Sequence, residues 1–151
     1  MSEGNPPPPR MDPKALEALG KNTIAEAIGL EILEVEHGRV VGRLPVDART
    51  HQPYGLLHGG ASVVLAETLG SVGSHFIAAP LGKAAVGIEV NANHLRGVRN
   101  GWVIGTATLH HEGGRLHVWH IDIRDEQDRA ICTSRLTVML VPQAAGQRPS
   151  E

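Results

Sequence analysis

The sequence predicts an α+β domain in which an antiparallel sheet of about five to six strands curves around one long central helix. Three observations support this prediction. The stretch from Gly60 to about Ala78 is apolar or small on every side apart from one carboxylate, which is typical of a buried helix. Two runs before it and four after it alternate between apolar and polar residues with the period of a strand. We expect the four later strands to follow one another in up-and-down order.

Two short helices are predicted before the first strand. Asp12 followed by Pro13 is typical of a helix N-cap and first turn, and the pattern continues through Leu19. Residues 23–28 add one or two further turns, which end at Gly29. These helices precede the sheet and do not interrupt it.

The strands follow from period-two alternation bounded by turn residues. The predicted strands span residues 30–36, 39–46, 84–95, 102–111, 116–124 and 130–141. Between the second strand and the long helix, residues 47–58 form a polar loop that is long for a compact domain, and such loops are often functional. Pro80 and Gly82 end the long helix.

One domain accounts for the length of 151 residues. We expect it to cover residues 11–142, with a proline-rich tail at 1–10 and a second tail at 143–151. An open antiparallel sheet has edges that invite pairing with another chain. A homodimer that continues the sheet is therefore predicted.

Composition limits the partners and the location. The formal net charge is −2 and the basic residues are scattered, so no electrostatic footprint for nucleic acid is present. No apolar run approaches the ~20 residues that a membrane helix needs, and the N-terminus lacks the apolar segment of a signal peptide. The single cysteine, Cys132, excludes an internal disulfide, fits a reducing compartment and is expected to be a small buried residue. We therefore predict a cytoplasmic protein that binds neither nucleic acid nor membrane.

Glu67 is the residue that points to chemistry. It is the only charged residue in the long apolar helix, and burying a carboxylate there costs several kcal/mol unless it is paired. His58 precedes it at the end of a glycine-bearing loop, and a helix start offers free N–H groups to negative charge. A carboxylate that can activate water, together with N–H groups that can hold an oxyanion, is suited to acyl hydrolysis.

Three segments resemble the hotdog-fold acyl-CoA thioesterases: Gln52 to Glu67, Glu89 to Arg96, and Val118 to Glu126. The resemblance extends from about Asn22 to Val141. It is greatest to the subgroup of 1,4-dihydroxy-2-naphthoyl-CoA hydrolases and enterobactin proofreading thioesterases, with Glu-type 4-hydroxybenzoyl-CoA thioesterases as more distant relatives. The resemblance implies hydrolysis of an aromatic or short-to-medium acyl thioester of coenzyme A or of an acyl carrier protein.

The resemblance also implies roles for individual residues. Glu67 would be the catalytic carboxylate, acting as general base or as nucleophile. The Gly59 backbone N–H would hold the thioester oxygen, while Gln52 and His58 would flank it and contact the carbonyl or the leaving thiolate.

Two further side chains complete the implied site. Ser71, at i+4 from Glu67, would position the water, and His94 would reach the far side of the site. In this family the site lies between two subunits, and dimers commonly pair into tetramers. Glu67 and the Gln52–Gly59 loop would then face each other across a dimer.

Binding of coenzyme A calls for basic groups near its phosphates. Arg96 and Arg115 are the predicted ligands, with the Gly113-Gly114 turn supplying backbone N–H groups. Coenzyme A is part of the substrate, so no separate cofactor is expected. No metal site is expected either, because the nine histidines form no set of converging ligands and His110 and His111 are adjacent on a strand.

Other interpretations remain open at this level. Glu67 could cap a neighbouring turn, Ser71 could serve only close helix packing, His58 could cap the helix, and Trp119 and His117 could pack together on one strand face. Two alternative functions are a hotdog hydratase or dehydratase acting on acyl thioesters, and a non-catalytic acyl-CoA-binding module.

Overall fold

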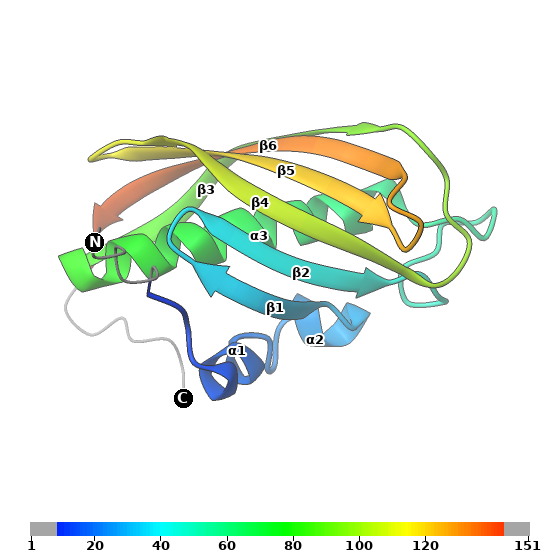
Figure 1. Ribbon diagram of the computed structural model, residues 1–151, viewed down its shortest axis with the longest axis horizontal. Helices are drawn as coiled ribbons and strands as arrows, with labels where there is room; N and C mark the ends of the chain where they lie inside the picture. The colour runs from blue at the N-terminus through cyan, green and yellow to red at the C-terminus, as the bar shows by residue number, and fades with distance from the viewer. Residues whose placement is uncertain (1–8, 144–151) are drawn as a thin grey trace, which may run out of the picture.

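The computed structural model describes residues 9–143 and consists of a six-stranded antiparallel sheet curved around one long helix, α3 (Gly59–Ala78), as Figure 1 shows. The predicted fold class is confirmed. The strands are β1 (Glu31–Glu36), β2 (Arg39–Pro45), β3 (Lys83–His94), β4 (Trp102–Glu112), β5 (Leu116–Asp125) and β6 (Ala130–Pro142).

The order of the strands differs from the prediction in one respect. The sheet order is β1-β2-β4-β5-β6-β3, so β3 pairs with the last strand and β4 pairs with β2. The up-and-down prediction is therefore wrong for β3. The connection at residues 95–101 is long enough to carry the chain across the end of the sheet, and buried Val98 anchors it there. As a result, β1 and β3 are the two open edges.

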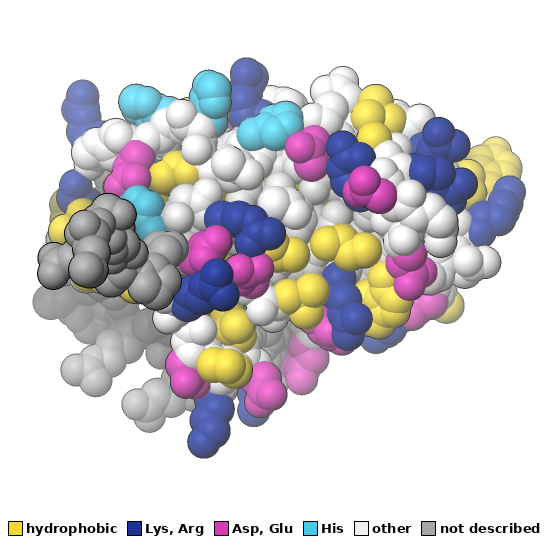
Figure 2. Space-filling view, in the orientation of Figure 1, with side chains coloured by type: hydrophobic (Ala, Val, Ile, Leu, Met, Phe, Trp, Pro, Cys, Tyr) yellow, Lys and Arg dark blue, Asp and Glu magenta, His cyan; other side chains and the backbone are white. Residues whose placement is uncertain are grey.

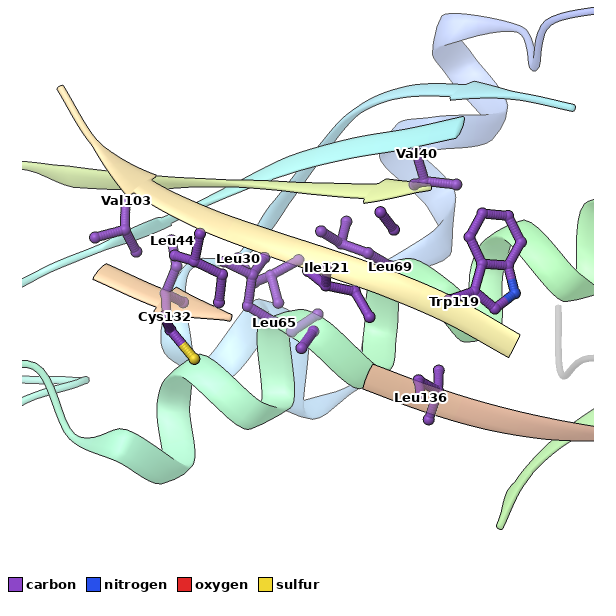
Figure 3. Packing of buried hydrophobic residues seen from close by; sticks show 14 of the residues in the cluster. Leu30, Val40, Leu44, Leu65, Leu69, Val103, Trp119, Ile121, Cys132 and Leu136 are labelled. Carbon is purple, nitrogen blue, oxygen red and sulfur yellow. The ribbon is translucent and has the colours of Figure 1, made fainter. Parts of the chain in front are cut away.

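One side of α3 packs against the inner face of the sheet. Figure 3 shows Leu65 and Leu69 pointing toward β5, where Ile121 and Trp119 are fully buried. Glycine permits this close approach, because a Cβ at Gly73 would lie 2.5 Å from the Trp119 ring. The opposite side of α3, which carries Glu67, is only half-buried. The helix is therefore anchored on one side and presents its carboxylate on the other.

The two short predicted helices form as expected: α1 (Pro13–Leu19) and α2 (Ile24–Ile28). The Asp12 side chain accepts the Lys14 N–H and Thr23 accepts the Ala25 N–H, so both N-caps are present. Arg10, which the sequence places in a tail, instead bridges to Glu36 of β1. The Gln143 N–H likewise bonds to the Gly82 carbonyl. Residues 1–8 and 144–151 of the predicted tails lie outside the described residues.

The prediction that no apolar run has the length of a membrane helix needs correction. Residues Gly59–Leu81, which are α3 and the short 3₁₀ helix η1 (Ala79–Leu81), are long and apolar enough to span a bilayer. In this fold the segment is the central helix, and the sheet wraps around it. The apolar character of α3 therefore serves the core of the domain.

Charged side chains are mixed on the face shown in Figure 2, where Lys and Arg lie among Asp and Glu. Ion pairs account for part of this pattern, for example Arg39 with Glu34 and Arg43 with Glu31. This face carries no extended basic surface of the kind that binds nucleic acid.

Candidate active site

The N-terminus of α3 presents one backbone N–H group without a partner. His58 is the N-cap: its Nδ1 accepts the Gly60 N–H at 2.8 Å, and its carbonyl accepts the N–H groups of Ala61 and Ser62. Among the described residues, the Gly59 N–H donates to no acceptor. This donor lies at the positive end of a long helix, where a negatively charged oxygen is stabilised.

The capping interpretation of His58 is confirmed, and it has a chemical consequence. Because Nδ1 accepts a backbone N–H, the proton of the neutral imidazole resides on Nε2. The ring therefore keeps one N–H donor for another group while it caps the helix. A role for His58 in binding or catalysis stays a prediction.

Gln52 is held at the base of a tight turn in the 47–58 loop. Its Oε1 accepts the Tyr54 N–H, its backbone N–H donates to the Leu56 carbonyl, and its own carbonyl accepts the Gly55 N–H. The carbonyl end of the side chain is therefore occupied. The Gln52 amide NH₂ has no partner among the described residues and remains available as a donor.

A cavity of about 340 Å³ brings four of the predicted site residues together: Gln52, Gly59, His94 and Arg96 all line it. His94 lies directly against the helix start, since a Cβ at Gly59 would be 2.7 Å from its Nε2. The absence of a side chain at Gly59 thus gives both His94 and a ligand access to the free N–H.

Glu67 lies further along α3, over strand β3. A Cβ at Gly87 would be 2.6 Å from Glu67 Oε1, so the carboxylate rests on the bare backbone of that glycine. A β-bulge at Ile88 interrupts the pairing of β3 with β6, which lets Gly87 and Val90 face the same side. In the described chain Glu67 forms no hydrogen bond or ion pair. The alternative interpretation, in which Glu67 caps a neighbouring turn, is therefore wrong.

The two halves of the predicted site do not meet within one chain. Gly59 and Glu67 are eight residues apart on one helix, which corresponds to a separation of about 12 Å along the axis. Ser71 shares the half-buried side of α3 with Glu67, but the described chain has no hydrogen bond between them. One thioester carbonyl cannot contact both the Gly59 N–H and the Glu67 carboxylate of the same chain.

The predicted coenzyme A ligands are also separated. Arg96 lies at the 340 Å³ cavity, just past the end of β3. The Arg115 carbonyl instead accepts the N–H of Leu140 in β6, and Leu140 pairs with Ala85 near the start of β3. The Gly113 N–H is already bonded to the Leu116 carbonyl, and the Gly114 carbonyl accepts Lys83 Nζ at 2.6 Å. The expectation that Gly113 offers a free N–H is therefore wrong.

A buried polar network near the other end of α3 was not predicted. Trp119 Nε1 donates to Ser74 Oγ at 2.8 Å, and the Ser74 hydroxyl lies 3.1 Å from His117 Nδ1. All three side chains are at most 1 % exposed, which confirms that His117 and Trp119 pack together. Burial lowers the pKa of His117 and outweighs the attraction of the Glu112 carboxylate. Ser74 and His117 are 43 residues apart in sequence, so no local pattern could reveal their contact.

Other titratable groups have structural roles. Cys132 is buried as expected, and burial raises the pKa of its thiol. The Arg49 guanidinium lowers the pKa of Asp47 to about 2. In the described residues no three His, Cys, Asp or Glu side chains converge as metal ligands would.

Comparison with known proteins decides the family. The model of the thioesterase superfamily matches residues 54–132. The chain belongs to this superfamily. Its fold is that of a hotdog thioesterase, and it is a thioester hydrolase by its similarity to close relatives.

Several bacterial members of the superfamily are similar to this chain. A putative esterase of Pseudomonas aeruginosa, PA1618, is 45% identical over 133 residues, covering 88% of this chain and 92% of its own. The 1,4-dihydroxy-2-naphthoyl-CoA hydrolase of Escherichia coli is 43% identical over 128 residues, covering 85% and 93%. The proofreading thioesterase EntH of Klebsiella pneumoniae is 45% identical over 122 residues, covering 81% and 88%. These relatives confirm the resemblance seen in the sequence.

Solved structures agree with this assignment. A mutant of thioesterase PA1618 superposes with a TM-score of 0.84 at 44% identity, covering 87% of this chain and 95% of that one. Thioesterase HI1161 of Haemophilus influenzae also gives a TM-score of 0.84, at 40% identity and with 91% and 96% covered.

Proposed function

We propose that this thioesterase hydrolyses acyl-CoA thioesters with aromatic or short-to-medium acyl groups, releasing the free acid and coenzyme A. The observation that carries the proposal is a pair of groups on α3 that have no partner among the described residues, the Glu67 carboxylate and the Gly59 N–H. Both groups are only half-buried, so both are available to a ligand. The hydrolases and proofreading thioesterases among its relatives support the same substrate class.

The proposed reaction uses each group for one step. Glu67 takes a proton from a water molecule as that water attacks the thioester carbonyl. The Gly59 N–H and the Gln52 amide donate to the carbonyl oxygen as it becomes negative, and one such donor is typically worth about 2.7–4 kcal/mol. The carbon–sulfur bond then breaks, and the leaving thiolate takes up the proton that Glu67 removed from the water, which restores the carboxylate. The His58 Nε2–H is a donor suited to stabilising the thiolate as it leaves. The alternative, direct attack by the Glu67 carboxylate, uses the same donors.

The reaction requires a second copy of the chain, since about 12 Å separates Gly59 from Glu67 within one chain. We propose that two copies pair through the open β3 edge. Glu67 lies over Gly87 and Gly59 lies against His94, so antiparallel pairing centred near Val90 and Asn91 brings each Glu67 to the Gly59 of the other copy. The exposed apolar side chains Val86 and Ile88 on this edge favour such burial.

The same pairing unites the proposed coenzyme A ligands. Antiparallel alignment of two β3 strands places the start of one beside the end of the other. Arg115 and the Gly114 N–H of one copy would then approach Arg96 of the second copy.

We propose further that two dimers associate into a tetramer and that the protein is cytoplasmic, where the free thiol of Cys132 remains reduced.

Thiol release from a panel of acyl-CoAs tests the proposal. Glu67→Gln should lower kcat/KM by about 10²–10⁴-fold, the usual contribution of a general base. Glu26→Gln, at an exposed position on α2, is the matched control and should retain wild-type activity. Hydration of an enoyl thioester without thiol release would support the hydratase alternative. Binding without turnover, unchanged in Glu67→Gln, would support the binding module.

The dimer is tested separately. Asn91→Cys, near the proposed pairing centre, should form a disulfide-linked dimer on oxidation, while wild-type Cys132 is buried and should not. Sedimentation as a monomer at micromolar concentration would contradict the shared site.

A further inference from the structure

We propose that the cavity between α1, β1 and α3 receives the acyl group of the substrate, and that Leu16 of α1 limits the size of the acyl group. This inference rests on the proposed thioester hydrolysis and names the substrate class within it: uncharged, apolar acyl groups. The cavity has a volume of about 530 Å³, which falls in the usual range for small-molecule sites.

The walls of the cavity are mostly apolar and come from three separate elements. Leu16 and Leu19 contribute from α1, Ile32 and Leu33 from β1, and Val72 from α3. A cavity with such a lining favours a hydrocarbon ligand, because binding removes the apolar surfaces of both the ligand and the cavity wall from contact with water.

The cavity borders α3 at positions that are next in sequence to the proposed catalytic carboxylate. Thr68 and Val72 line it, and each immediately follows one of the predicted site residues Glu67 and Ser71 in α3. Adjacent helix positions differ by about 100° around the axis and 1.5 Å along it. An acyl chain whose carbonyl carbon lies at Glu67 would therefore cross the half-buried side of α3 to reach the cavity.

The α1 wall of the cavity is held near its N-terminal end and is only partly buried along its length, with Leu16 packed against the core. At the N-terminal end the Met11 N–H bonds to the Val35 carbonyl and Arg10 pairs with Glu36. Within α1 no residue is fully buried, and Leu19 is 36% exposed although it faces an apolar space. A ligand in the cavity would complete the burial of these side chains.

Two carboxylates at the cavity restrict the charge of its ligand. Glu31 is neutralised by Arg43 at 2.7 Å, whereas Glu17 has no ion pair in the described chain. A carboxylate at the far end of an acyl group would meet this negative charge. The site therefore favours neutral acyl chains or aryl rings over dicarboxylic acyl groups.

Substitutions on one helix test the assignment. Leu16→Trp fills the cavity, and Ala15→Trp places the same side chain on the neighbouring exposed position, which does not line it. We would measure kcat/KM for acetyl-, butyryl-, hexanoyl-, decanoyl- and benzoyl-CoA. A site that loses room for a methylene group discriminates by about tenfold or more. Leu16→Trp should therefore lose about that factor on decanoyl- and hexanoyl-CoA relative to acetyl-CoA, while Ala15→Trp should match the wild type.

A third variant distinguishes a change in the acyl site from misfolding. Leu16→Ala enlarges the cavity and should raise the decanoyl-to-butyryl ratio of kcat/KM, the opposite of Leu16→Trp. Thermal unfolding of all three variants reports whether each is folded. If folded Leu16→Trp and Leu16→Ala both keep the wild-type profile across the acyl series, the assignment is overturned while the hydrolytic function stands. If the wild type releases no thiol from any acyl-CoA, the proposed function itself fails and takes the assignment with it.

Discussion

The polar groups near the two ends of α3 differ in whether they have hydrogen-bond partners within the protein. At the N-terminal end, the Gly59 N–H and the Gln52 amide lie beside a cavity and have no protein partner among the described residues. Toward the C-terminal end, Ser74 lies between His117 and Trp119, and all three are buried and hydrogen-bonded. Both regions include residues of α3, yet only the first has hydrogen-bond donors that are available to a ligand. Satisfied polar groups fix the helix on the sheet, whereas unsatisfied ones are available for chemistry.

The largest effect that this contrast predicts is at Gly59. Gly59→Ala should lower kcat/KM by about 10²–10³-fold, because its Cβ displaces His94 and covers the free N–H of the oxyanion site. Glu26→Gln, at an exposed position on α2, is again the control, because Glu26 lines neither cavity. Steady-state kinetics with one acyl-CoA checks both. Equal activity of the two variants would mean that the Gly59 N–H is not part of the site.

At the other end the expected effect is on stability. Ser74→Ala should lower the free energy of unfolding by about 2–3 kcal/mol, because the Trp119 N–H and His117 Nδ1 are left buried without a partner. Ser71→Ala, one helical turn earlier and half-buried, should change stability by only about 0.5 kcal/mol. Urea unfolding measures the difference. A larger loss of stability in Ser71→Ala than in Ser74→Ala would contradict a stabilising role for the buried Ser74 network.

The smallest predicted effect is a pH dependence of stability. Burial lowers the pKa of His117 below its ordinary value of 6.5, so the folded protein keeps this ring neutral while the unfolded chain takes up a proton. The unfolded state then binds more protons, and stability falls as pH decreases below 6.5. Urea unfolding between pH 8 and 5 should show this loss in the wild type and a smaller one in His117→Gln. An identical pH dependence in both proteins would contradict it.

Local patterns predicted most of the fold because they depend on neighbours in sequence. Alternation located the strand Trp102–Glu112 to within one residue, and the isolated charge of Glu67 located the half-buried side of α3. Alternation does not specify which strands pair, so the position of β3 at the sheet edge could not be predicted. The same limit applies to Arg96, which follows the end of β3, and Arg115, which bonds to β6 beside the residue that pairs near the start of β3.

The site was predictable where its parts are contiguous. Gln52, His58 and Gly59 lie within one short stretch of chain, and the fold brings Gln52 and Gly59 to one cavity. The Ser74 network joins residues from α3 and β5, and the α1 cavity needs three elements to form. Neither contact has a signature in a single segment, because each is made only when distant segments pack.

The position of α3 in the chain has a consequence for biosynthesis. The helix is as apolar as a membrane span, and four of the six strands that cover it follow it in sequence. Because a ribosome delivers the N-terminal part first, the helix is made before β3, β4, β5 and β6 can shield it. Its two neighbours β1 and β2 provide only partial cover during that interval. Premature termination before β6 would therefore leave a chain prone to aggregation, and refolding should be slow because the closing contacts are distant in sequence.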